Sequence, residues 1–81
     1  MITMLVLRNI RRTAEFIEAD FYIEGEEPKG HVKISLPDGE YLEVIPSPKY
    51  THSTAPSHAK YELQRLAKRE TLPEEKKVFW Y

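Results

Sequence analysis

The chain has 81 residues, of which 41% are hydrophobic and 31% are charged, and its formal net charge is −1. This length predicts one domain, residues 1–81, because two halves would each be too small to bury a core. The near-balance of charge argues against nucleic-acid binding, which usually needs a positive excess. The chain has no cysteine, which excludes disulfides and thiolate metal sites and favours a cytoplasmic protein over a secreted one.

The N-terminal segment is a run of strand-forming residues from Ile2 to Leu7. It is apolar at nearly every position, which predicts a strand that is covered on both faces or contacts another chain. The run is too short to span a bilayer and lacks the basic start of a signal peptide, so we expect no membrane association. Residues 9–13 are polar and predict a turn.

Three further strands show an alternation of apolar and polar residues, which puts the apolar side chains on one face. The apolar positions are Ile17, Ala19, Phe21 and Ile23 in the first, Val32, Ile34 and Leu36 in the second, and Leu42 and Val44 in the third. Residues 25–30 read as a loop. The tripeptide at residues 37–39, Pro-Asp-Gly, is typical of a tight hairpin loop with a bulge at Gly39.

The alternation also predicts a pairing register for an antiparallel meander. The expected pairs are Leu36–Glu40, Ile34–Leu42, Val32–Val44, Phe21–Ile34 and Ile23–Val32. On the outer face, this register places Tyr22, Lys33 and Glu43 in one row and His31 beside Glu24.

The C-terminal third predicts a loop, a helix and a last strand. Residues 46–53 contain two prolines and cannot extend the sheet. Ser53 or Thr54 can cap a helix with Pro56 in its first turn, and Leu72-Pro73 is expected to end it. An apolar stripe at helical spacing consists of Ala55, Ala59, Leu63, Leu66 and Ala67. The bulky residues 78–81 predict a short strand that docks on the sheet.

These elements predict an α+β fold, a mostly antiparallel sheet of four to five strands in the order β-β-β-β-α-β with one helix packed on one face. The expected core consists of Ile17, Ala19, Phe21, Ile23, Val32, Ile34, Leu36, Leu42, Val44, Ala59, Leu63, Leu66 and one or two of Val78, Phe79 and Trp80.

No set of residues indicates catalysis, a metal or a cofactor. His52 and His58 are separated by five residues across a loop, a spacing that fixes no metal geometry and is typical of surface histidines. Tyr50 and Ser53 near His52 lack an orienting carboxylate and a glycine-rich elbow. The acidic residues on one face of the second strand are expected to act as solubilising charges, namely Glu18, Asp20 and Glu24. We therefore expect a protein that is not an enzyme.

The outer sheet face retains aromatic residues that one helix cannot cover. The expected binding residues there are Phe16, Tyr22, Lys33, Tyr41 and Glu43. Exposed rings of this kind usually mark a surface that binds a partner, although tyrosine is also common in strands because of its high β-propensity. The leading hypothesis is a small protein-interaction or regulatory module that binds a protein partner or forms a homodimer through this open face.

An alternative hypothesis rests on the three neighbouring arginines, Arg8, Arg11 and Arg12. Together with the aromatic residues of the sheet, they could bind single-stranded nucleic acid, since bases stack on rings and arginines contact phosphates. The net charge and the acidic residues of the same face disfavour this alternative.

Three segments carry a resemblance to other proteins: residues 16–22 (FIEADFY), residues 29–33 (KGHVK) and the ending from Leu72-Pro73 to Trp80-Tyr81. Together they resemble a group of small uncharacterised bacterial proteins, over most of the chain. The resemblance implies a bacterial, cytoplasmic setting and implies no activity.

Overall fold

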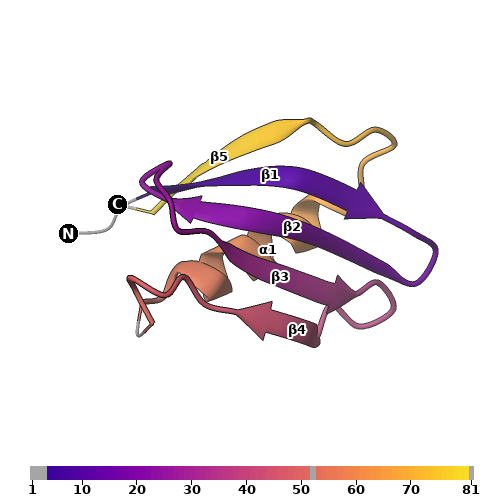
Figure 1. The fold of residues 1–81 in the computed structure, drawn as a ribbon. Helices are drawn as coiled ribbons and strands as arrows, with labels where there is room; N and C mark the ends of the chain where they lie inside the picture. The colour runs from indigo at the N-terminus through magenta and orange to yellow at the C-terminus, as the bar shows by residue number, and fades with distance from the viewer. Residues whose placement is uncertain (1–3, 52, 81) are drawn as a thin grey trace.

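The computed structural model describes residues 4–51 and 53–80, which form a five-stranded sheet and a helix (Figure 1). The elements are β1 (Met4–Arg12), β2 (Phe16–Ile23), β3 (Gly30–Ser35), β4 (Tyr41–Ile45), α1 (Ala55–Leu66) and β5 (Glu75–Phe79). All neighbouring strands are antiparallel, in the order β4-β3-β2-β1-β5. The predicted α+β fold with one helix on one face of the sheet is confirmed.

Strand β1 lies inside the sheet, between β2 and β5. Leu5 and Leu7 face the helix side, and Val6 faces the opposite side, yet all three are buried. The prediction of a strand covered on both faces is confirmed, although residues 1–3 lie outside the described residues. The predicted turn at residues 9–13 is wrong, because β1 continues to Arg12 through a bulge. Asn9 takes a φ of 56° there, a conformation that asparagine tolerates better than most residues.

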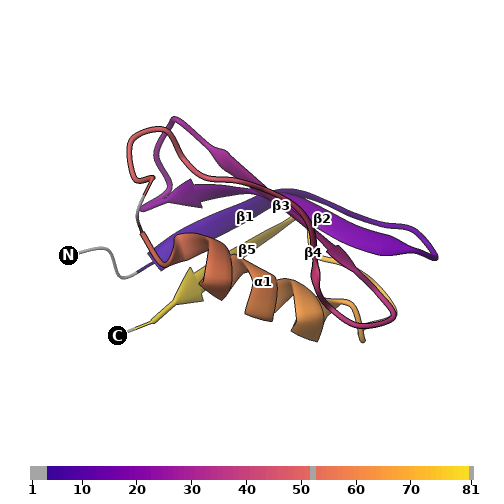
Figure 2. The same cartoon turned by 90° about the horizontal axis from the view of Figure 1, so that it is seen from below.

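Helix α1 lies across one face of the sheet, as Figure 2 shows. The predicted apolar stripe is confirmed, with Ala55, Ala59, Leu63 and Leu66 buried in the core. The helix ends at Leu66 rather than at Leu72-Pro73. Beyond that point the chain turns, and the guanidinium of Arg12 donates to three carbonyl oxygens of the segment, those of residues 67, 69 and 70. Of the two predicted caps, Thr54 occupies the N-cap position but its side chain makes no capping hydrogen bond, while Oγ of Ser53 accepts from the Ala55 N–H at 3.3 Å.

The core matches the prediction except at its edge. Leu42 and Val44 were expected inside but are 57% and 42% exposed, and Leu36 is only partly buried. The core also includes Leu5, Leu7 and Ala55, alongside Val78 and the other predicted residues of β2, β3 and α1. Leu42 and Val44 are exposed because an α-helix is only about 10 Å wide and strands lie about 4.8 Å apart, so α1 cannot cover five strands.

The predicted pairing of β2 with β3 is wrong by four residues. The observed pairs are Ile17–Ile34, Ala19–Val32, Asp20–His31 and Phe21–Gly30. Alternation decides which side chains share a face, but any even shift preserves the faces. The register depends on Gly30, because a Cβ there would collide with the Phe21 ring and lie 2.7 Å from the carbonyl oxygen of Ile45.

Strand β4 pairs with β3 in nearly the predicted register. Val32 faces Val44 as expected, and Lys33 faces Glu43. The expected Ile34–Leu42 pair is wrong, because a bulge places Ile34 opposite Tyr41. In the hairpin loop, the Ser35 N–H donates to the Glu40 carbonyl at 2.8 Å, in place of the expected Leu36–Glu40 pairing. Gly39 has the positive φ, 71°, that its predicted bulge position requires.

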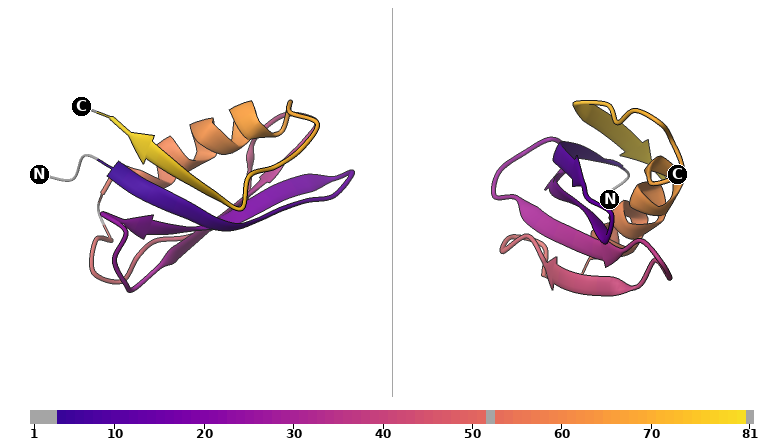
Figure 3. Two further views of the ribbon diagram at one scale, coloured as in Figure 1. Left: turned by 90° about the horizontal axis from the view of Figure 1, so that it is seen from above. Right: turned by 90° about the vertical axis from the view of Figure 1, so that its right-hand side faces the viewer.

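The last strand docks as predicted, although it begins earlier, at Glu75. Val78 is buried, and the ring of Trp80 stacks on His58 of α1 with 4.1 Å between centroids and an interplanar angle of 7°. Tyr81 lies outside the described residues. Figure 3 shows how the sheet curves around α1 and leaves β4 and β5 at its two ends. Within the described residues, no helix is long and apolar enough to cross a membrane.

Candidate functional site at the open sheet edge

Strand β4 is the most exposed apolar element of the sheet. All five of its residues are exposed, and four of them are large apolar residues: Tyr41 (37%), Leu42 (57%), Val44 (42%) and Ile45 (51%). The strand forms one end of the sheet, so within the described part of the chain one of its edges has no neighbouring strand (Figure 1). Unpaired N–H and C=O groups beside apolar side chains are the features that favour addition of another strand.

Helix α1 reaches towards the β3–β4 hairpin with polar side chains rather than with its apolar stripe. The Lys60 ammonium lies 4.6 Å from the centroid of the Tyr41 ring and 3.5 Å from a carboxylate oxygen of Glu40. Gln64 donates from Nε2 to the Gly39 carbonyl oxygen at 3.0 Å. These contacts hold the hairpin to α1 at its turn and leave Val44 and Ile45 exposed to solvent.

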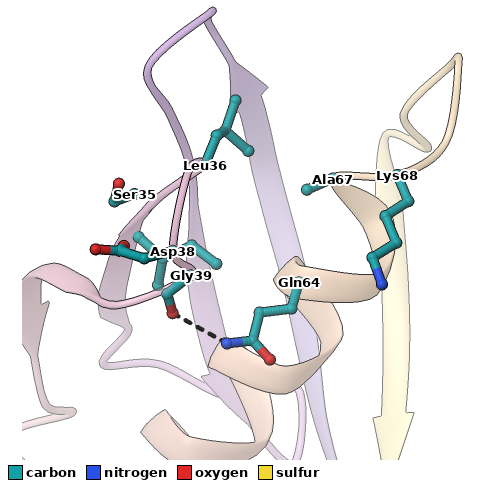
Figure 4. Close-up of a pocket in the computed structure, with 8 residues that line it drawn as sticks. Ser35, Leu36, Asp38, Gly39, Gln64, Ala67 and Lys68 are labelled. Carbon is teal, nitrogen blue, oxygen red and sulfur yellow. Dashed lines mark hydrogen bonds between the residues drawn. The ribbon is translucent and has the colours of Figure 1, made fainter.

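A hollow of about 490 Å³ opens between the hairpin turn and the end of α1 (Figure 4). It is lined by Ile34, Ser35, Leu36, Asp38, Gly39, Gln64, Ala67 and Lys68. The Gln64–Gly39 hydrogen bond crosses it, and its apolar lining comes from Ile34, Leu36 and Ala67. The hollow has a size that suits a small ligand, but it is open to solvent, and none of its polar side chains is buried. We therefore assign it no function.

A row of alternating charge runs across the outer face of the sheet to β4. Lys33 of β3 is paired with Glu18 of β2 on one side and with Glu43 of β4 on the other. The Lys33 ammonium is drawn towards Phe16, where it lies 4.1 Å from the ring centroid. Among the described residues, the contact of the Glu43 carboxylate with a basic side chain is a long one: its Oε1 lies 3.9 Å from Nε2 of His31.

His31 is the centre of a polar cluster next to this row. Its Nδ1 lies 2.8 Å from Oδ1 of Asp20, and its Nε2 lies 2.8 Å from Oε1 of Glu18. Carboxylates only accept, so both contacts are hydrogen bonds when both ring nitrogens carry protons. Asp20 also accepts from Nδ2 of Asn9 at 2.7 Å and from Nζ of Lys29 at 3.0 Å.

The cluster shifts the pKa values of two of its members. Burial raises the pKa of Asp20, but hydrogen bonds from His31, Asn9 and Lys29 outweigh that effect, so its pKa lies below the ordinary 3.8. The hydrogen bond with Asp20 raises the pKa of Lys29 above 10.5. Because the groups satisfy one another, the cluster acts as a structural network that links β1, β2 and β3. In residues 4–51 and 53–80 no three acidic or histidine side chains form a group that could hold a metal ion.

The five predicted binding residues do not form one surface. Lys33 and Glu43 are neighbours on the outer face, and Phe16 lies beside them under the Lys33 ammonium. The expected row is wrong at Tyr22, which is 9% exposed and pairs with Val6 beneath the Arg8 guanidinium. Tyr41 is on the helix side, against Lys60. His31 lies beside Asp20 and Glu18, not beside Glu24 as the predicted register required.

The three arginines of the alternative hypothesis serve separate regions. Arg8 stacks 4.8 Å above the Tyr22 ring and pairs with Glu75 at 3.3 Å. Arg12 is engaged with the backbone carbonyls after α1. Arg11 lines a second hollow, which lies beside the His31 cluster and is also lined by Glu18 and Asp20. The arrangement is not a continuous basic surface.

The residues that sequence reasoning missed as surface are Leu42 and Val44. Their alternation is that of a half-buried strand, and it gave no sign that the covering helix stops short of them. The signal that could have found them is the ratio of one 12-residue helix to five strands, which leaves an edge strand uncovered.

Comparisons with known proteins give no match: no family model, no curated protein and no solved structure matches the chain.

Proposed function

We propose that the protein is a small, non-enzymatic interaction module that binds an extended segment of a partner protein as an added strand along β4. The observation that carries the proposal is the exposure of four large apolar side chains on an edge strand. Burying them stabilises the complex by the hydrophobic effect, while the backbone of the added strand pairs with the free edge. We expect the module to act in the bacterial cytoplasm.

A separate partner fits this edge better than a second copy of the chain does. If two β4 strands paired antiparallel about their midpoints, Glu43 of one copy would face Glu43 of the other. Like charges directly opposite each other destabilise a strand pair. We therefore expect a monomer when molar mass is measured by light scattering over a range of protein concentrations.

The proposal is tested by selecting extended peptides against the protein and then changing the edge. Octapeptides with apolar residues at alternate positions are selected from a displayed library for binding to the wild-type chain. Binding is then measured to Val44→Lys and, as a matched control, to Tyr61→Lys. Both changes replace an exposed apolar residue, 42% and 60% exposed respectively, but Tyr61 lies on α1. Both variants should fold as well as the wild type.

The proposal predicts that Val44→Lys abolishes binding of the selected peptides and that Tyr61→Lys leaves it unchanged, since an edge lysine blocks strand addition. Peptides that bind Val44→Lys as tightly as the wild type would contradict it. A dimer that Val44→Lys dissociates would show that a second copy, rather than a separate partner, occupies β4.

A further inference from the structure

The proposed strand addition leaves open which sequence the partner segment carries, and the charges around β4 bear on that choice. The outer-face row runs acidic, basic, acidic from β2 to β4, through Glu18, Lys33 and Glu43. A strand added to β4 places one of its residues directly beside Glu43 on the same face. Opposite charges at such cross-strand positions stabilise the pair, and like charges destabilise it.

Glu43 has capacity for a further cation. Its side chain is 53% exposed, and its contact with His31 is 3.9 Å long, while His31 makes much shorter contacts with Asp20 and Glu18. Lys33, the residue paired with Glu43, instead directs its ammonium over Phe16. The carboxylate at the open edge is therefore the least satisfied charge of the row.

Glu43 lies between the apolar residues Leu42 and Val44, and Ile45 follows Val44. The apolar side chains of β4 lie on both of its faces. Val44 is paired with the core residue Val32, and so belongs to the helix side. Ile45 is paired with His31 and belongs to the outer face. An added strand therefore meets apolar side chains before and after Glu43, and it meets one negative charge at the middle.

We propose that the segment bound by β4 is an extended peptide with a lysine or arginine opposite Glu43 and apolar residues on both sides of it. This inference rests on the proposed function, because it names the partner class for the same edge. The protein already contains a strand of that kind. In β3, Lys33 stands between Val32 and Ile34 and faces Glu43 from the other edge of β4.

The β3 sequence supplies the probe for the test. A synthetic peptide of residues 29–36, Lys-Gly-His-Val-Lys-Ile-Ser-Leu with blocked ends, is titrated into the isotope-labelled full chain and followed by NMR. The matched control is the same peptide with Lys33→Glu. Both peptides are also titrated into the Glu43→Lys protein, which keeps the apolar side chains of β4 and reverses the central charge.

The inference predicts that the lysine peptide shifts the amide signals of residues 41–45 and binds about 2- to 30-fold more tightly than the Lys33→Glu peptide. In the Glu43→Lys protein the preference should reverse. The difference should shrink as salt is raised, because exposed pairs are screened.

Two other outcomes overturn different parts of the account. If both peptides shift the amide signals of residues 41–45 with equal affinity in both proteins, β4 binds added strands whatever charge they carry opposite residue 43. The inference of a basic residue is then wrong, while the proposed function stands. If neither peptide shifts residues 41–45, strand addition at β4 is itself contradicted, and the inference falls with it.

Discussion

The two edge strands of the sheet, β4 and β5, each have one edge that is open to pairing with another chain, and they differ in the side chains that they present there. Strand β5 has the sequence EKKVF and presents three charged residues and one exposed apolar ring, Phe79, and its Glu75 is held by Arg8. Strand β4 has the sequence YLEVI and presents one charge among four large apolar residues. Lysines on an edge discourage pairing with other chains. The contrast supports the proposal that strand addition takes place at β4 rather than at β5.

The sheet is anchored differently at the two ends as well. Beside β5, buried Val78 and the Trp80–His58 stack fasten the chain to the core and to α1. Beside β4, the helix contributes the polar contacts of Lys60 and Gln64. Exposed apolar patches on a protein surface usually mark a binding site, because they otherwise lower solubility. The exposed apolar side chains of β4 therefore support the proposed binding role of this edge.

The largest expected effect is on stability, and it compares the same substitution, isoleucine to alanine, in the core and at the β4 edge. Ile34 on β3 is 1% exposed and Ile45 on β4 is 51% exposed. Ile34→Ala should destabilise the protein by about 2–5 kcal/mol, because it leaves a cavity in the core. Ile45→Ala should change stability by no more than about 0.5 kcal/mol. Urea unfolding of both variants measures the difference, and similar losses would mean that β4 belongs to the core.

A second change tests what positions β4 on the sheet. Gly30→Ala should cost about 1–3 kcal/mol, because the new Cβ collides with the Phe21 ring and with the carbonyl oxygen of Ile45. The check is a double-mutant cycle with Phe21→Leu, whose smaller side chain relieves part of the collision. If Gly30→Ala is neutral, the register between β2, β3 and β4 does not depend on this glycine.

A third change tests the anchoring on the β5 side. Arg12→Ala should cost about 1–2 kcal/mol, because it removes the donor to carbonyl oxygens of the segment that leads from α1 to β5. Arg11→Ala is the matched control next to it in the chain, and we expect a change within about 0.5 kcal/mol. Equal losses in thermal unfolding would contradict the structural role assigned to Arg12.

The smallest effect expected concerns pH and the cluster beside β4. The pKa of Asp20 is lower in the folded protein than its ordinary 3.8, so its stabilising contribution is present above that value. It is lost as the pH falls through the folded-state pKa. Asp20→Asn should therefore lower stability at pH 7 and weaken its fall below about pH 4. The exposed Glu26→Gln is the control, and an unchanged pH profile in Asp20→Asn would contradict the prediction.

The sequence predicts which face of each strand is apolar, and that part of the fold follows from it. The period-two pattern of residues 17–24 and 31–36 and the helical stripe from Ala55 to Leu66 need no knowledge of neighbours. The unbroken run at the start of β1 likewise predicts burial on both faces, which Val6 shows on the outer side. These inferences concern single segments, where local periodicity is sufficient.

What could not be predicted depends on contacts between segments. The register of β2 on β3 depends on the space that Gly30 leaves for the Phe21 ring, a three-dimensional fit that alternation does not encode. The polar composition of residues 9–13 indicates a turn, but a bulge at Asn9 allows β1 to continue through these residues to Arg12. The candidate site was missed for a related reason: Leu42 and Val44 have the pattern of core residues, and only the position of α1 makes them surface.

The measurement that tests strand addition most directly is amide hydrogen exchange of the full chain, with and without a saturating amount of the residue 29–36 peptide. Strands β4 and β5 are then compared within one molecule. The account predicts slower exchange for amides of residues 41–45 and unchanged exchange for residues 75–79, because the peptide pairs with the open edge alone. Unchanged exchange in β4, or slowing confined to β5, would contradict it.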